Sequence, residues 1–349
     1  MMRRVCLFLC GILLCLAFSS CAEAPEEEFP LPFSDLELSD YLTLGEYRGL
    51  AVPASELAIT GEEFTAQAES DFADEMRLTD RALAEGDRIC LNYTAEFEGE
   101  TYNDDTEDGF FLTLGKNELG IPGFDEGLIG KTPGEEVTLE LSFPADYEKE
   151  PAYAGKAVTF TVTVQYIALP LPEITDELVS SHTTYQTAEE YREGVTKALS
   201  DVKKVNYLWN KVKESSAVLQ YPEKEFENSY NDFLASYTQL AKNYNMSLAE
   251  LVEASGETMA DFYDEADRSV KDHLKEDLII AAIARAEGMS VTAEEYEAGV
   301  ESYYQNTASN YYLSRQLMEN ALGKDMLTAQ VLSGKVLDLI CDTAVVTED

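Results

Sequence analysis

The chain has 349 residues, of which 67 are acidic and 25 are basic, giving a formal net charge of −42 at pH 7. This excess argues against nucleic acid as a partner, because phosphate binding needs a basic surface, and it disfavours electrostatic docking onto anionic lipid. A chain of this length is expected to fold into roughly two or three domains.

Residues 1–20 have the pattern of an export signal. Two arginines precede an apolar run, residues 5–18, which is shorter than the roughly 20 residues needed to span a bilayer. Two serines and Cys21 follow, as is typical of a bacterial lipoprotein signal peptide that is cut before a lipidated cysteine. Phe18 departs from the usual leucine, and an uncleaved anchor or an ordinary signal peptide are the alternatives. Each reading places residues 22–349 outside the cytoplasm, and we expect the lipid-anchored form at the cell membrane.

Cysteine usage agrees with export of a lipid-anchored chain. Beyond Cys21, only Cys90 and Cys341 remain after the signal, so no disulfide framework is indicated, and whether these two pair stays open. His182 and His273 are the only histidines, and neither has a cysteine or histidine at metal-ligand spacing, so no metal site is expected. Neither lies near Cys90 in the sequence, which disfavours that thiol as a catalytic nucleophile.

The first segments after the signal are short. Residues 21–46, with several acidic residues and prolines, are interpreted as the lipidated cysteine and an acidic tether. Residues 47–85 are expected to form a short strand and helix segment, and residues 42–52 offer a strand pair. The helix is predicted from a Thr60-x-x-Glu63 capping box and from apolar residues at helical spacing that follow it: Phe64, Ala68, Phe72 and Met76.

Residues 86–168 have the pattern of a small antiparallel sheet with a short helix. Three runs alternate apolar and polar residues, as half-buried strands do: residues 89–95, 137–141 and 158–164. A glycine-rich stretch separates the first run from the second, and residues 123–130 within it are the best candidate for the helix. The acidic run at residues 104–108 lacks the spacing of an EF-hand loop, so a solvated loop is expected there.

Residues 169–349 change to long helices. Apolar residues recur at steps of three and four, and capping boxes begin several helices, as at Thr187-x-x-Glu190. Pro222 opens a helix that carries Phe226, Tyr230, Phe233 and Tyr237. Later helices are rich in tyrosine, and they either present amphipathic contact surface to other chains or serve as helical core. The tyrosines concerned are Tyr303, Tyr304, Tyr311 and Tyr312.

The ordered motifs of residues 86–168 resemble those of the FKBP-type prolyl isomerase domain, especially the one inside trigger factor. They are G-D-x-I-x-L-x-Y, G-x-x-Y, I-P-G-F-x-x-G-L-x-G, G-E-x-V, F-P-x-x-Y, A-G-K and F-x-V-x-V. The later helices are similar to the helical C-terminal domain of trigger factor, whose extended arms cradle unfolded chains. The resemblance implies an α+β fold, with a small antiparallel FKBP-like sheet wrapped on a short helix and followed by an extended all-α chaperone domain.

By this resemblance, an aromatic pocket would be assembled from six catalytic residues: Tyr93, Tyr102, Phe110, Ile121, Phe124 and Phe160. Tyr147 and Asn103 would add to substrate binding. Asn103 stands where many family members have aspartate, and the stretch between Gly115 and Ile121 is one residue longer than usual. The alternative interpretation is that these aromatic residues form only a hydrophobic core.

The chemistry that the resemblance implies needs neither cofactor nor metal. Rotation about a prolyl peptide bond takes tens to hundreds of seconds, because amide resonance must be lost. A catalyst must favour the twisted amide, whose carbonyl is less polar, and a dry aromatic cup that holds the proline ring does so. Residues 86–168 contain no histidine, which fits a mechanism without a general acid or base.

The sequence therefore predicts a peptidyl-prolyl isomerase and chaperone that assists the folding of exported proteins at the outer face of the membrane. Its expected partners are unfolded or nascent exported polypeptides with proline-containing segments, and the membrane through lipid on Cys21. No ribosome contact is expected, because the basic, glycine-containing ribosome-binding signature of that family is missing. The alternatives are a non-catalytic holdase with a vestigial FKBP-like domain and, more remotely, a solute-binding lipoprotein.

Overall fold

The computed structural model describes residue 29 and residues 31–104 and 109–348, and it divides the chain into two compact units. The sheet unit comprises Ile59–Thr196, and the helical unit comprises the described residues up to Ala58 together with those from Lys197 onward. Among the described residues, every helix is too short or too polar to cross a bilayer. Each unit has its own hydrophobic core.

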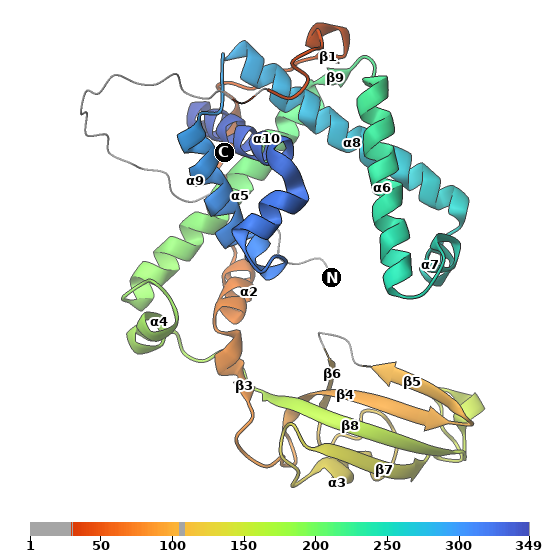
Figure 1. The fold of residues 1–349 in the computed structure, drawn as a ribbon. Helices are drawn as coiled ribbons and strands as arrows, with labels where there is room; N and C mark the ends of the chain where they lie inside the picture. The colour runs from red at the N-terminus through yellow and green to blue at the C-terminus, as the bar shows by residue number, and fades with distance from the viewer. Residues whose placement is uncertain (1–28, 30, 105–108, 349) are drawn as a thin grey trace. The chain divides into compact units, whose positions relative to one another are not determined.

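The sheet unit is built on a six-stranded sheet in which all the pairings are antiparallel. Its two long strands, β4 and β8, pair with each other at its centre, and the others pair with one of these two (Figure 1). The strands are β3 (Arg77–Leu78), β4 (Arg88–Phe97), β5 (Glu100–Asp104), β6 (Phe110–Thr113), β7 (Glu136–Ser142) and β8 (Ala157–Ala168). The three runs predicted as strands thus lie within β4, β7 and β8.

The predicted short helix forms as α3 (Phe124–Leu128) and packs against β7. It begins after Gly123, whose φ of 91° is a left-handed conformation that glycine adopts without strain. A Cβ at that position would also lie 2.9 Å from Cδ2 of Leu141 on β7. The glycine therefore allows the chain to turn sharply and to approach the sheet closely.

Besides short 3-10 turns, the sheet unit contains three α-helical segments: α2 (Gly61–Asp71), α4 (Asp176–His182) and the first part of α5 (Ala188–Ser215). The predicted capping box of Thr60 and Glu63 is confirmed at the start of α2. Tyr191 of α5 is buried against Phe72, and its hydroxyl donates a hydrogen bond of 2.8 Å to Asp71. Burial raises the pKa of that hydroxyl, so it stays a neutral donor.

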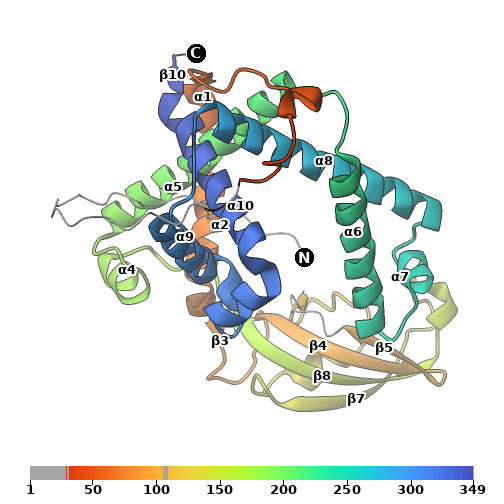
Figure 2. The same ribbon diagram turned by 45° about the horizontal axis from the view of Figure 1, so that its top comes forward.

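Among the described residues, the helical unit contains the rest of α5, the short helix α1 (Ala54–Leu57) and five longer helices (Figure 2). The five longer helices are α6 (Glu223–Asn243), α7 (Leu248–Ala254), α8 (Met259–Ala286), α9 (Ala293–Asn306) and α10 (Arg315–Thr343). The apolar stripe of α8 lies at the centre of the core, with Leu278, Ile279 and Ile283 completely buried. α10 is interrupted at Gly323, whose φ of 78° and ψ of 160° are not helical.

The N-terminal residues of the helical unit pack into its core. Leu38, Leu42 and Val52 are buried. The expected strand pair within residues 42–52 is wrong, because β1 (Leu42–Thr43) pairs with β9 (Ala217–Val218) and β2 (Ala51–Pro53) pairs with β10 (Val345–Thr347). The described part of the predicted tether is thus anchored to the core of the helical unit at Phe29, Leu38 and Leu42.

Candidate active site

The sheet of the sheet unit has one aromatic face. Residues directly opposite each other on paired strands point to the same side, as do alternate residues along one strand. Phe110 lies opposite Leu91. Tyr102 and Phe160 lie opposite Ala95, on the two strands that flank it. Leu91 and Ala95 alternate with Tyr93 along β4, so the register places four predicted site residues on one face: Tyr93, Tyr102, Phe110 and Phe160.

Ring contacts join most of these side chains. The ring centroid of Tyr93 is 5.8 Å from that of Phe110 and 5.9 Å from that of Phe160, both in edge arrangements. Phe160 is in turn 5.1 Å from Phe124, with an interplanar angle of 88°. Edge-to-face pairs are favoured by the ring quadrupole and contribute about 0.5–1.5 kcal/mol each beyond burial. The rings therefore follow one another in the order Phe110, Tyr93, Phe160, Phe124.

Ile121 and Phe124 approach this face from the segment that forms α3. Phe124 is completely buried and Ile121 is 3% exposed, whereas Tyr102 on β5 is 44% exposed. Tyr93 and Phe110 are half-buried between these extremes. We call the five aromatic residues of this site, Tyr93, Tyr102, Phe110, Phe124 and Phe160, the aromatic set. It excludes water at Phe124 and is open to solvent at Tyr102, as a binding surface for an apolar ring requires.

Tyr147 lies against the loop that leads to Ile121. Its hydroxyl donates a hydrogen bond of 3.1 Å to the carbonyl of Leu119. A Cβ at Gly120 would lie 3.5 Å from Cε2 of the same ring, so the loop and the ring are in close contact. Burial raises the pKa of Tyr147, which keeps the hydroxyl protonated and able to donate. Tyr147 thus contacts the loop beside the aromatic set, and its own ring partner is Phe143, at 4.9 Å.

Asp125 is a residue of this site that the sequence analysis missed. Its side chain is 4% exposed, and its Oδ2 accepts hydrogen bonds from the backbone N–H groups of Gly115 and Asn117, at 2.8 and 2.9 Å. Gly115, Asn117 and Gly120 all have positive φ, so the loop that precedes Ile121 is tightly turned. The carboxylate therefore fixes one wall of the aromatic face. The only sequence signal was an acidic residue directly after the predicted base residue, Phe124.

Three other predicted features are placed only in part. The backbone of Asn103 pairs with Thr94 in the β4 and β5 register, but its side chain is outside the described structure. Most of the acidic run, residues 105–108, and the predicted lipid site, Cys21, also lie outside the described residues. Cys90 is buried on the opposite face of β4, so it is not part of the aromatic set.

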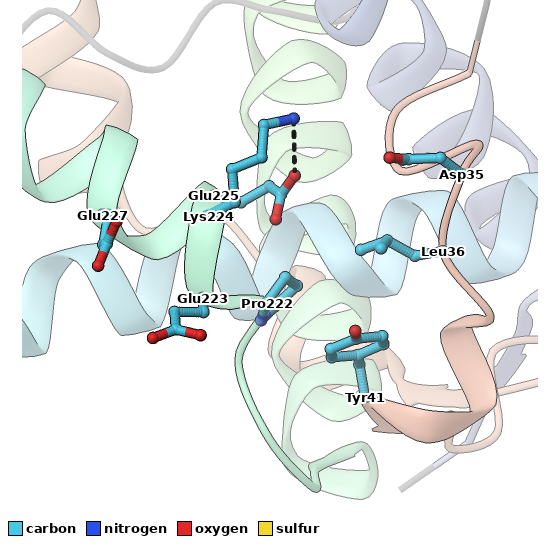
Figure 3. Close-up of a pocket in the computed structure, with 8 residues that line it drawn as sticks. All are labelled: Asp35, Leu36, Tyr41, Pro222, Glu223, Lys224, Glu225 and Glu227. Carbon is cyan, nitrogen blue, oxygen red and sulfur yellow. Dashed lines mark ion pairs between the residues drawn. The ribbon is translucent and has the colours of Figure 1, made fainter.

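The helical unit contains a cavity of about 390 Å³ that Figure 3 shows in close-up. Its lining is mostly polar and acidic, and comprises Asp35, Leu36, Tyr41, Pro222, Glu223, Lys224, Glu225 and Glu227. None of these side chains is a cysteine, histidine or serine. Within the described ranges, no group of three or more potential ligands is arranged to hold a metal ion. The aromatic face of the sheet is therefore the better candidate for an active site.

Comparison with known proteins defines the class of the sheet unit. A family model described as FKBP-type peptidyl-prolyl cis-trans isomerase matches residues 79–165, which include the whole aromatic set, Tyr147 and Asp125. The sheet unit therefore contains an FKBP-type peptidyl-prolyl cis-trans isomerase domain. A second model, described as the bacterial trigger factor protein C-terminus, matches residues 185–342. With these two domains in this order, the chain has the domain composition of a trigger factor-like protein.

Similarity to trigger factors extends over most of the chain. The trigger factor of Clostridioides difficile (strain 630) is 26% identical over 326 residues, covering 89% of this chain and 74% of that protein. That of Caldicellulosiruptor bescii is 26% identical over 88% of this chain and 72% of its own length. A solved structure, from work on promiscuous substrate recognition by the trigger factor chaperone, covers 86% of this chain and 72% of its own at 21% identity, with a TM-score of 0.38.

Proposed function

We propose that this chain is an exported, lipid-anchored member of the trigger factor family, which binds unfolded exported polypeptides and catalyses their prolyl isomerisation outside the membrane. The observation that carries the catalytic part is the continuous set of rings from Phe110 through Tyr93 and Phe160 to Phe124. These rings give an apolar surface on which a proline ring can be held away from water.

Such a surface lowers the barrier by differential binding. The planar amide has a more polar carbonyl than the twisted amide of the transition state, so a dry site favours the twisted form. Each 1.36 kcal/mol of preferential binding gives about tenfold in rate. Because no proton moves, the absence of histidine from residues 86–168 costs nothing.

The proposed binding of unfolded chains draws on the helical unit. Along α6, Phe226 stacks on Tyr230 at 5.8 Å and Phe233 stacks on Tyr237 at 4.8 Å. Tyr237 is 38% exposed, Leu240 42% and Tyr244 62%. A row of partly exposed aromatic and aliphatic side chains can contact apolar segments of many sequences. This surface supports a chaperone role in addition to catalysis.

A holdase without useful catalysis is the second candidate. Asn103 stands where many FKBP-type domains have aspartate, and the Gly115 to Ile121 loop is one residue longer than is usual. Both changes affect residues beside the aromatic set, so they bear on the isomerase rate and leave the fold unchanged.

Proline-limited refolding of a model protein separates the two candidates. We expect the chain to accelerate the slow refolding phase, and Tyr93→Ala to reduce that acceleration roughly tenfold, which corresponds to about 1.4 kcal/mol of lost transition-state binding. Tyr166→Ala is the matched control, because Tyr166 lies on β8 opposite Cys90, on the other face of the sheet. If the unaltered chain suppresses aggregation and leaves the slow phase unchanged, the holdase is correct.

The proposed location depends on Cys21, which follows an apolar run and two serines. Growth with a radioactive fatty acid should label the chain and place it in the membrane fraction. Cys21→Ala should abolish labelling, because it removes the thiol that would carry the lipid. Labelling that persists in Cys21→Ala would show that the lipid is attached to a residue other than Cys21. An unlabelled chain in the cytoplasm would overturn export itself.

A further inference from the structure

The connection between α9 and α10 displays apolar side chains to solvent. Leu313 is 95% exposed and Tyr311 80%, the two highest values among the large apolar side chains that the structure describes. Leu317, in the first turn of α10, is 50% exposed. We call residues 307–317 the hairpin tip. Exposed apolar side chains that gather on one surface mark sites of contact with another protein or with a membrane.

The hairpin tip is held in a fixed shape. The backbone N–H groups of Tyr311 and Tyr312 donate to the carbonyl of Ala308, at 3.0 and 2.9 Å. Ala308 is 2% exposed and Met318 is completely buried, so the segment is pinned to the core at both ends. The exposed side chains of Tyr311 and Leu313 therefore project from an ordered support.

The charge of the hairpin tip differs from that of the chain. Residues 302–318 contain no aspartate or glutamate and one basic residue, Arg315, in a protein of net charge −42. Three carboxylates that flank the stretch in sequence or space, those of Glu297, Glu301 and Glu319, form ion pairs with Arg315, which offsets one of their three charges. The hairpin tip itself has no carboxylate that an anionic surface would repel, in contrast to most of the molecule.

The N-terminal segment is docked on the same helical hairpin. Phe29 is 6% exposed and stacks on Tyr296 of α9 with centroids 4.8 Å apart. Nζ of Lys324 of α10 lies 4.0 Å from the centre of the Phe29 ring, and the Phe29 N–H donates to the carbonyl of Val291. The first described residue of the chain is thus fixed between α9 and α10.

Chain length then limits how far the hairpin tip can lie from Cys21. Phe29 is eight residues after Cys21, and eight residues span at most about 29 Å. From Tyr296 to the end of α9 at Asn306 is ten residues, or about 15 Å of helix. The tip is therefore within reach of a bilayer that holds a lipid on Cys21.

We propose that the hairpin tip is a membrane-contact surface, in which Tyr311, Leu313 and Leu317 enter the interface between lipid headgroups and acyl chains. This proposal rests on the proposed lipid anchor at Cys21. Tyrosine is suited to such an interface, because its ring is apolar and its hydroxyl remains in the headgroup region. Because Phe29 is docked on α9 and α10, a lipid on Cys21 would keep the hairpin tip close to the bilayer. The local concentration of lipid is then high, so a small apolar surface is enough for the hairpin tip to bind the membrane.

The test uses the chain from Cys21 onward, which retains every described residue, coupled through Cys21 to a maleimide lipid in phosphatidylglycerol and phosphatidylcholine vesicles. This coupling makes the experiment independent of whether cells lipidate Cys21. Cys90 is buried, and burial raises the pKa of Cys341 to about 11, so neither competes strongly for the reagent at neutral pH. Leu313→Trp is introduced with Trp209→Phe, which removes the one natural tryptophan.

With brominated acyl chains, we expect the Leu313→Trp emission to shift to the blue and to lose roughly half its intensity, as for a side chain buried 5–10 Å into the interface. Val346→Trp is the matched control: Val346 is 52% exposed and follows the C-terminal end of α10, away from the tip, so its emission should not change (Figure 2). Phe29→Ala should weaken the quenching at Leu313→Trp.

Unchanged emission of the tethered Leu313→Trp chain overturns the membrane contact, whatever the fatty-acid labelling shows. Equal quenching with and without Phe29→Ala overturns the role of the docked segment. A shift at Leu313→Trp that appears with an unfolded client protein and not with vesicles would assign the hairpin tip to client binding instead.

Discussion

Phe124→Ala is expected to remove about 3–5 kcal/mol from the unfolding free energy of the sheet unit, enough to unfold a marginal domain. Phe124 is completely buried at the start of α3 and contacts Phe160 edge to face at 5.1 Å. Truncation removes the apolar burial and leaves a cavity that the strands around it cannot fill. Isomerase activity should be lost with the fold, because the same ring forms the base of the aromatic face.

Hydrogen exchange can follow this loss separately in the two units. The amides of β4 and β8 should lose protection in Phe124→Ala, while those of α8 in the helical unit should keep theirs, since each unit has its own core. Phe124→Leu, which keeps most of the volume, should cost about 1.5 kcal/mol or less and preserve protection. Unchanged protection of β4 and β8 in Phe124→Ala would mean that Phe124 does not support the sheet.

Elements fixed by local pattern were predicted well from the sequence. The alternation in residues 158–164 indicates a strand because successive side chains point to opposite faces, and β8 has that pattern of burial. The capping boxes at Thr60 and Thr187 each need only four residues, and both are present. Strand alternation and capping boxes depend only on residues that are close together in the sequence, so a single sequence is enough to predict them.

Features that depend on distant residues were not predictable in this way. The pairing of β2 with β10 joins segments almost 300 residues apart, and short strands carry no signal for a partner at that distance. From the sequence, Phe29 was interpreted as part of a tether. In the structure, its ring contacts Tyr296 and Lys324, which are more than 260 residues away in the sequence. For the candidate site, the sequence analysis named the aromatic residues, whose catalytic role stays a prediction. It could not name Asp125, because the hydrogen bonds of that side chain depend on how the preceding loop folds back.

Asp125→Ala should reduce kcat/KM for prolyl isomerisation by about ten- to a hundredfold in the protein that remains folded, because small displacements beside a reacting group are that costly. The change leaves the N–H groups of Gly115 and Asn117 without their acceptor. A donor left without an acceptor costs about 1–3 kcal/mol where water cannot reach it. The loop relieves this cost by opening to water, which moves Ile121 and the carbonyl that Tyr147 contacts. Stability and refolding catalysis are measured on the same samples.

The neighbouring carboxylate provides the control for this prediction. Glu126 accepts one backbone hydrogen bond, from Gly123 at 3.1 Å, and its side chain is exposed, so water can replace the acceptor in Glu126→Ala. Asp125→Asn keeps an oxygen for the loop but places an amide N–H₂ where Oδ1 has no hydrogen-bond partner among the described residues. Compared with Asp125→Ala, Asp125→Asn should therefore regain more of the lost kcat/KM than of the lost unfolding free energy. If Asp125→Ala lowers stability while the folded fraction keeps its full kcat/KM, the carboxylate supports the fold and does not position the site.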